Sequence, residues 1–224
     1  MKEEQHRQMS ESFAVGILLI LAGGFQDAYT YIYRGGVFAN AQTGNVVLLG
    51  KNVAEGAWSE ALHYLIPILV FIAGVFLSQE IQYHFKTNKS IHWRQITLIF
   101  EIATLFAAGL MPADGRGNII ANSLVSFSCA MQMDSFRKVN GSAFATTMCV
   151  GNLRNATALL CAYTETKDRE SGKKSLEKYF LIFVFAVGAV SGNFAALAIG
   201  AKAVWFCCAA LAAAFFIMFR RTQE

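Results

Sequence analysis

The chain has 224 residues, of which 55% are hydrophobic and only 15% are charged, and its formal net charge is +4. Because a typical soluble domain carries about 25% charged residues, this composition excludes an ordinary soluble protein and favours an integral membrane protein. The charges gather near the two ends of the chain and in two inner clusters, 84–94 and 163–178. We expect both inner clusters to be cytoplasmic loops.

Six long apolar runs lie between the charge clusters, and each is close to the roughly 17–25 residues that a membrane-spanning helix needs. In chain order they are 12–33, 61–79, 95–111, 117–133, 179–201 and 203–219. Two shorter runs, 35–50 and 139–153, contain several Asn and Thr residues. At about 1.5 Å per residue, they reach only about 24 Å of a hydrocarbon core of about 30 Å.

We therefore predict an all-α membrane protein that forms a single transmembrane domain over residues 1–224. It has about six transmembrane helices and two short motif helices or re-entrant segments. If the two short runs do not cross, nearly all Lys and Arg residues fall on the side of the two termini. The exceptions are Arg34, Lys51, Arg116 and Lys202. Since positive charges accumulate on the cytoplasmic side, both termini are predicted to be cytoplasmic.

The two halves of the chain repeat a short pattern, in which a Gly-Asn pair begins seventeen residues after an aspartate. The residues are Asp27 with Gly44 and Asn45, and Asp134 with Gly151 and Asn152. We predict two pseudo-symmetric repeats, over about 12–111 and about 117–219. With three spans in each, the second repeat would be inverted in the membrane. Inverted repeats are typical of transporters, whose sites lie near the midplane where the repeats meet.

The first pattern resembles the signature of a known family, the YoaK family of small bacterial inner-membrane proteins, a domain of unknown function. The resemblance rests on GFQDA at 24–28, GGVF at 35–38, QTGN at 42–45 and LG at 49–50. It covers nearly the whole chain, including the block from Gln132 to Asn152, where Val150 replaces the expected Thr. The resemblance implies a multi-pass protein of the bacterial inner membrane with about six spans, and it supplies no substrate.

Asp27 is the first candidate for a functional role, because a carboxylate inside a span costs at least a few kcal/mol unless it is paired or hydrated. It could bind a proton or a solute. Alternatively, it could be a structural clamp that accepts hydrogen bonds from the following segment, for example from Thr43 or Asn45. Glu101, which lies deep in its own span, is a second candidate for a proton relay or for pairing with another helix.

Asp134 lies close to Arg137 in the sequence, so an interfacial salt bridge competes with a binding role. The remaining candidates for binding a solute or ion are polar or glycine residues of the two motifs, for which tight helix packing is the alternative. They are Gln26, Gln42, Thr43, Gly44, Asn45, Gln132, Gly151 and Asn152. A stripe of small residues predicts a helix-packing face, within the chain or with a second copy. It consists of Gly188, Gly192, Ala196 and Gly200.

The sequence contains no HExxH, CxxC, nucleophile elbow, Walker loop or dinucleotide fingerprint, so we expect no enzyme, no metal site and no cofactor. The positive charge suits loops that face anionic lipid, rather than nucleic acid. We expect a transporter or channel for a small solute or ion, with proton coupling as a hypothesis that rests on the buried carboxylates. The alternative is a non-transporting scaffold, sensor or partner subunit. A homodimer would assemble twelve spans, and an intramembrane enzyme acting on lipid is a weaker third alternative.

Overall fold

The computed structural model describes residues 9–86 and 92–220, and within these ranges the fold is almost entirely helical. The α-helices are α1 (Phe13–Tyr33), α2 (Gln42–Ala54), α3 (Trp58–Phe85), α4 (Trp93–Leu110), α5 (Gly115–Ser135), α6 (Cys149–Thr166), α7 (Arg169–Ile199) and α8 (Trp205–Arg220). The short elements are η1 (Met9–Glu11), β1 (Lys138–Val139), β2 (Ser142–Ala143) and η2 (Gly200–Val204). The prediction of an all-α membrane protein is confirmed.

Four helical stretches are long and apolar enough to cross a membrane by length and composition, namely 13–33, 58–85, 93–110 and 169–218. The last stretch contains both α7 and α8. Helix α5, which the sequence predicted as the fourth span, does not belong to this set. Its polar side chains are buried, as Asn122 and Ser126 show with no exposed surface, and these two donate to the carbonyls of Arg34 and Ala39 between α1 and α2. The helix therefore needs less apolar sequence than one that faces lipid.

The segment 163–178, predicted as a cytoplasmic loop, is instead the tip of a long helical hairpin. Helix α6 ends where Lys167 adopts the left-handed conformation, with φ of 56°. Helix α7 begins directly afterwards, because the Asp168 side chain accepts hydrogen bonds from the backbone N–H groups of Glu170 and Ser171. The charged residues from 169 to 178 thus form the first turns of α7 rather than a loop. The other predicted loop, 84–94, joins α3 to α4, and part of it lies outside the described residues.

Polar contacts at the two ends of the bundle fix the directions of the helices. At one end, Arg34 follows α1 and binds both the carbonyls that end α4 and the side chain of Asn118 in the first turn of α5. At the other end, Arg94 in the first turn of α4 donates to the Ser10 hydroxyl before α1 and to the Ser135 carbonyl that ends α5. Helices α1 and α4 therefore run one way, and α5 runs the other way.

The directions of the remaining long helices follow from similar contacts. Helix α3 ends beside the end of α5, where the Ser78 and Ser135 hydroxyls are 2.9 Å apart. Helix α7 ends at the opposite end of the bundle, and α8 begins there, where the Trp205 indole donates to the Phe106 carbonyl near the end of α4. Each of α5, α7 and α8 therefore runs opposite to its counterpart α1, α3 or α4.

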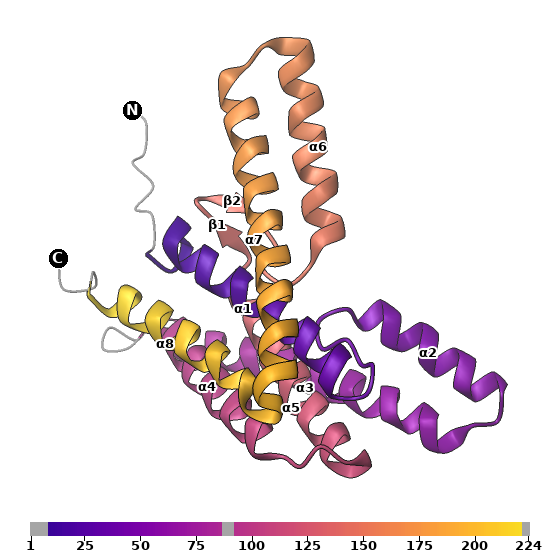
Figure 1. Cartoon of the computed structure of the whole chain (residues 1–224). Coiled ribbons are helices and arrows are strands. Elements are labelled where there is room, and N and C mark those ends of the chain that lie inside the picture. Colours follow the sequence, from indigo (N-terminus) through magenta and orange to yellow (C-terminus); the bar gives the residue numbers. More distant parts are fainter. Residues whose placement is uncertain (1–8, 87–91, 221–224) are drawn as a thin grey trace.

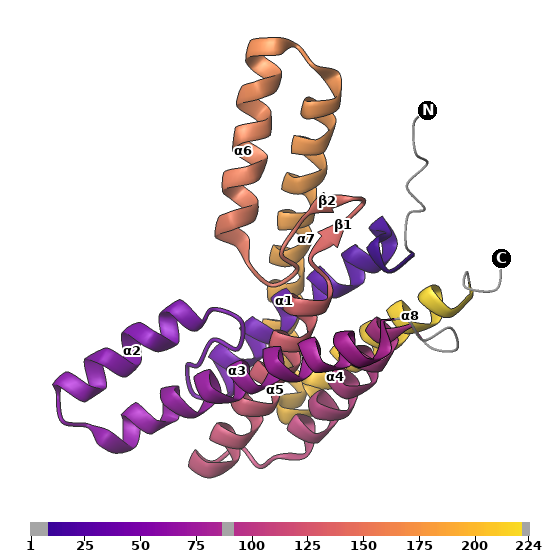
Figure 2. The ribbon, with the colours of Figure 1, turned by 180° about the vertical axis from the view of Figure 1, so that it is seen from behind.

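The neighbours of the helices follow a reciprocal pattern. Helix α1 packs along α7, and α3 packs along α5; α4 contacts α5, and α8 contacts α1. If each helix of the first half is replaced by its counterpart in the second half (α1 by α5, α3 by α7, α4 by α8) and the reverse, the set of pairings stays the same. The shorter helices α2 and α6 lie against α3 and α7, and the two resulting hairpins project from the helical body in different directions (Figures 1 and 2).

Glycines allow α1 and α7 to approach with their backbones almost in contact. A Cβ atom added to Gly188 would lie 2.2 Å from the Leu21 carbonyl oxygen, and one added to Gly192 would lie 2.6 Å from that of Phe25. Ala196, one turn further on, is buried. Gly200, the last member of the predicted stripe, instead ends α7 with φ of 61°. The stripe thus faces a helix of the same chain.

Candidate functional site

An asparagine in each half of the chain closes a loop with the same pair of hydrogen bonds. The Asn45 side chain donates to the Phe38 carbonyl at 2.7 Å and accepts from the Phe38 N–H at 3.3 Å. The Asn152 side chain does the same with Ala145, at 2.7 and 3.2 Å. We call the segments that precede α2 and α6 the first motif loop (34–41) and the second motif loop (136–148).

The glycines of the Gly-Asn motifs do not turn the backbone. Gly44 and Gly151 lie in the first turns of α2 and α6, and neither is among the glycines with positive φ. The turn is made earlier, by Gly35 and Gly36 with φ of 84° and 78°. A Cβ atom at Gly151 would meet no atom within 4 Å, so the position has room for a side chain.

Asp27 fastens the first motif loop to α1. Its Oδ1 accepts a 2.9 Å hydrogen bond from the Asn40 N–H, and the Asn40 side chain donates to the Gly23 carbonyl at 3.0 Å. The donor is thus neither Thr43, which is exposed, nor Asn45, which binds within the loop. The carboxylate holds the loop at the point where it returns toward α2.

Gln42 supports the same loop from the start of α2. Its side chain donates to the Ala39 carbonyl at 2.9 Å and accepts from Asn45 at 3.0 Å. Gln132 acts similarly in the second half, where it donates to the Leu19 carbonyl of α1 and to the Thr146 hydroxyl of the second motif loop. Both glutamines therefore connect a motif loop to its surroundings.

A second group of polar residues lies inside the bundle, and we call it the buried acidic cluster (Gln26, Asp27, Glu101 and Cys129). Asp27 is half-buried, and the other three have almost no exposed surface. The Cys129 thiol of α5 donates to the Gln26 side-chain oxygen at 2.9 Å. Glu101 on α4 has no exposed surface, and among the described residues neither of its carboxyl oxygens has a hydrogen-bond partner. An ionised carboxylate without donors there costs several kcal/mol, so the site favours a bound proton or cation on Glu101.

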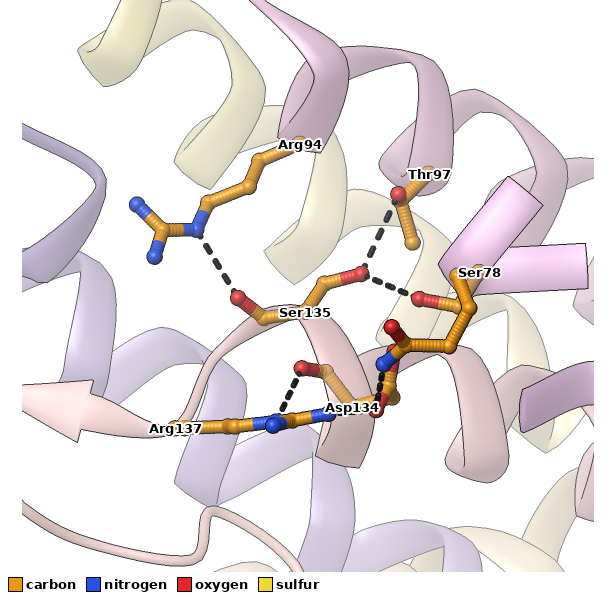
Figure 3. Close-up of polar contacts among 7 residues, drawn as sticks. Ser78, Arg94, Thr97, Asp134, Ser135 and Arg137 are labelled. Carbon is orange, nitrogen blue, oxygen red and sulfur yellow. Dashed lines mark hydrogen bonds and ion pairs between the residues drawn. The ribbon is translucent and has the colours of Figure 1, made fainter. Parts of the chain in front are cut away.

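Asp134, the counterpart of Asp27, has different partners. Both of its carboxylate oxygens accept from the Gln79 side chain at 2.7 Å, and Oδ1 also pairs with the Arg137 guanidinium. Figure 3 shows this ion pair beside Ser135, whose hydroxyl bonds to Thr97. The salt bridge foreseen as an alternative is therefore present, and Asp134 binds its motif loop only near the start of that loop, through Arg137.

Three predicted residues of the second half lie around one cavity of about 410 Å³, which we call the second-motif pocket. Asp134 and Arg137 form one wall, and Gly151, Asn152 and Asn155 form another. The pocket thus combines an ion pair and the Asn155 side chain with apolar lining residues that include Phe144 and Met148, whereas the Asn152 carboxamide is already bound to the backbone. The predicted residues therefore do not form a single site. Some lie at this pocket and some in the buried acidic cluster, and the others lie at neither: Gln42, Thr43, Gly44, Asn45 and Gln132.

Sequence reasoning missed the role of Arg34, which was counted only as a loop charge. Its side chain has no exposed surface, and it donates to the Tyr29 hydroxyl and the Asn118 side chain. It also donates to three backbone carbonyls at the end of α4, those of Ala108, Met111 and Pro112. The signal available was its position between an apolar span and a Gly-Gly turn.

Comparison with known proteins places the chain in a family. No curated protein and no solved structure matches it. A family described as Protein of unknown function (DUF1275) matches residues 15–217, which include all the helices from α1 to α8 almost completely. This match agrees with the resemblance found in the two motifs. The chain therefore belongs to the DUF1275 family of proteins of unknown function.

Proposed function

We propose that this protein is a multi-pass transporter or channel of the bacterial inner membrane that moves a small solute or ion and binds a proton at Glu101. One observation carries the proposal: Glu101 is a fully buried carboxyl group whose oxygens have no hydrogen-bond partner among the described residues. Ionisable residues inside spans are rare and are functional by default.

The position of Glu101 suits a site near the membrane midplane. It lies roughly in the middle of α4, about 12 Å from the start of the helix at about 1.5 Å per residue. Within the described ranges, no group of three or more His, Cys, Asp or Glu could hold a metal ion. A single carboxyl group is better suited to a proton than to a cation that needs several oxygen ligands.

The architecture that we propose is two inverted repeats, over about 12–111 and 117–219, with α2 and α6 outside the six spans. Its support is that each of α1, α3 and α4 runs opposite to its counterpart and that the helix pairings are reciprocal. The two motif loops would then enter from opposite faces, and both termini would share one side. The excess of Lys and Arg between 154 and 178 favours the cytoplasm as that side.

Proton flux into liposomes tests the proposal without a known substrate. The purified protein is reconstituted with a pH-sensitive dye inside, and a potassium gradient with valinomycin supplies the driving potential. We expect flux from the wild type and from the control Glu60→Gln, which changes an exposed carboxyl group on α3. Glu101→Gln should abolish flux while the protein stays folded. Equal flux from Glu101→Gln and the wild type would contradict the proposal.

A non-transporting scaffold, sensor or partner subunit is the second candidate, and the hydrogen bond from Asn40 to Asp27 favours it. In that case the carboxylate serves only to hold the first motif loop. Asp27→Asn would then lower the melting temperature in detergent, and neither Asp27→Asn nor Glu101→Gln would change any flux. A protein that transports should instead lose pH-dependent flux in Asp27→Asn.

A further inference from the structure

A groove near the tip of the α6–α7 hairpin lies outside both groups of residues described above. Its volume is about 540 Å³, and Leu160, Tyr163, Arg169, Lys173 and Leu176 are among its lining residues. Leu176 is 71% exposed and Leu160 is 42% exposed, although both are apolar. The groove therefore combines two cations with an uncovered apolar wall. We call it the hairpin groove.

The shape of the hairpin groove is fixed by contacts between α6 and α7. The Tyr163 ring lies directly against Gly172, where a Cβ atom would be 2.9 Å from the ring. The Ser175 hydroxyl, at the floor, donates to the Ala156 carbonyl at 2.8 Å. At the end nearer the bundle, the hydroxyls of Thr157 and Tyr179 are 2.8 Å apart. The groove is thus a feature of the packed hairpin, and its formation does not depend on a bound molecule.

The charge of the hairpin groove is positive. Arg169 and Lys173 are exposed and lie one helical turn apart on α7. The nearby Glu170 pairs with Lys174 at 2.6 Å, and none of the residues that line the groove is acidic. Among residues 9–86 and 92–220, no carboxylate lies within 4 Å of the charged groups of Arg169 or Lys173. The two cations are therefore available to an anion from outside the chain.

The groove also lies at the boundary between the polar and apolar parts of α7. The uncharged run of this helix begins at Tyr179, beside the groove, and continues to residue 201. The ten residues before Tyr179 extend about 15 Å at about 1.5 Å per residue. If 179–201 spans the hydrocarbon core, Lys173 and Arg169 lie about 9 and 15 Å along the helix from its edge, at the outer side of the headgroup layer, and Tyr179 lies at the interface, where Tyr residues are enriched.

We propose that the hairpin groove binds an anionic phospholipid of the surrounding bilayer. The phosphate lies between Arg169 and Lys173, and an acyl chain lies along Leu160 and Leu176. Two adjacent cations suit a phosphate group, and juxtamembrane basic residues attract anionic lipid. The apolar wall distinguishes this site from one for a free anion, because inorganic phosphate would leave the leucines exposed to water.

Native mass spectrometry of the detergent-solubilised protein tests the proposal by titration with dioleoyl phosphatidylglycerol or dioleoyl phosphatidylcholine. We expect the wild type to bind the first lipid more tightly than the second. Arg169→Gln/Lys173→Gln should weaken phosphatidylglycerol binding about 30-fold, the effect of two cations at about 1 kcal/mol each. The control Lys51→Gln/Arg116→Gln removes two exposed charges at the other end of the bundle and should bind as the wild type does.

Two further arms separate a lipid site from other outcomes. Leu176→Gln keeps both cations and changes an exposed side chain, so the protein should stay folded, and its phosphatidylglycerol binding should weaken. Competition by millimolar inorganic phosphate, or unchanged binding in Leu176→Gln, would show a site for free anions and overturn the proposal. An equal loss in the control variant would show diffuse attraction and would also overturn it. Circular dichroism of each variant in phosphatidylcholine micelles verifies its fold.

Discussion

Replacing Arg34 with Met should destabilise the protein more than any substitution of an exposed cation. The guanidinium is fully buried and joins the ends of α1 and α4 to the start of α5. Met fills a similar volume but donates no hydrogen bond. Three carbonyls at the end of α4 and the Tyr29 hydroxyl would then lose this donor. The bonds to Tyr29 and Ala108 are buried, whereas those to Met111 and Pro112 are only partly buried.

The magnitude follows from the bonds that are lost. Four of them are 3.1 Å or shorter: those to the Tyr29 hydroxyl and to the carbonyls of Ala108, Met111 and Pro112. Hydrogen bonds between membrane helices average about 0.6 kcal/mol, and those to charged groups reach about 1.5–3 kcal/mol. At about 1 kcal/mol each, and allowing for the guanidinium that no longer needs to be desolvated, the loss is about 3 kcal/mol. Lys at this position keeps the charge but cannot reach all four acceptors, so it should lose less.

The assay is unfolding of the purified protein in mild detergent, followed by circular dichroism during titration with a denaturing detergent. Arg116→Met is the matched control, because Arg116 is exposed in the first turn of α5 near the same end of the bundle. We expect Arg34→Met to be less stable than this control by about 3 kcal/mol, and Arg34→Lys to lie between them. A difference of less than about 0.5 kcal/mol between Arg34→Met and Arg116→Met would refute the reasoning.

Three other predictions concern the loops, the helix crossing and pH. Asn45→Ala and Asn152→Ala should each lower stability by about 1–3 kcal/mol in the same unfolding assay, because each removes a pair of backbone bonds; a change in only one half would contradict the common role. Gly188→Val should cost at least about 2 kcal/mol by driving a side chain into α1, whereas Gly151→Ala, at an open helical position, should gain up to about 1 kcal/mol. Burial and then a neighbouring guanidinium lower the pKa of His92 from 6.5. The unfolded state therefore binds the proton more readily, and stability should fall as the pH drops below about 6.5. Melting temperatures of the wild type and of His92→Gln across this range verify the last prediction, and parallel profiles would contradict it.

The apolar periodic runs of the sequence were sufficient to locate six of the helices, because a span needs uninterrupted apolar residues whatever its partners. The predicted helix boundaries were wrong where a cluster of charged residues was interpreted as a loop. Helix α7 starts at Arg169 rather than 179, because charged residues form a stable helix in water when the helix is capped and its charges are paired. Here Asp168 caps the helix, and Lys174 pairs with Glu170. The β-hairpin was missed although its turn, Asn140-Gly141, is a strong local signal.

The residues of the candidate site were predicted less well than the helices. Asp27, Asn45 and Asn152 were found because they repeat in the sequence, but their partners depend on how separate segments meet. The donor to Asp27 is a backbone N–H, which no sequence pattern reveals. Asp134 occupies the position equivalent to Asp27, yet the nearby Arg137 and the distant Gln79 bind its carboxylate. Equivalent positions in a repeat therefore need not have equivalent chemistry.

The reciprocal pairing of the helices constrains how the chain is made. Helix α1 leaves the ribosome first, but its main partner, α7, follows only after five other helices. Until then the face of α1 that meets the α7 glycines must remain in lipid or be shielded by the insertion machinery. Likewise, α3 is made before its main partner, α5. Neither half has its complement within itself, so a ribosome that stops after α4 releases a product with no route to the native packing. Two separately translated halves, inserted into the same membrane, would have all the surfaces needed to complete each other.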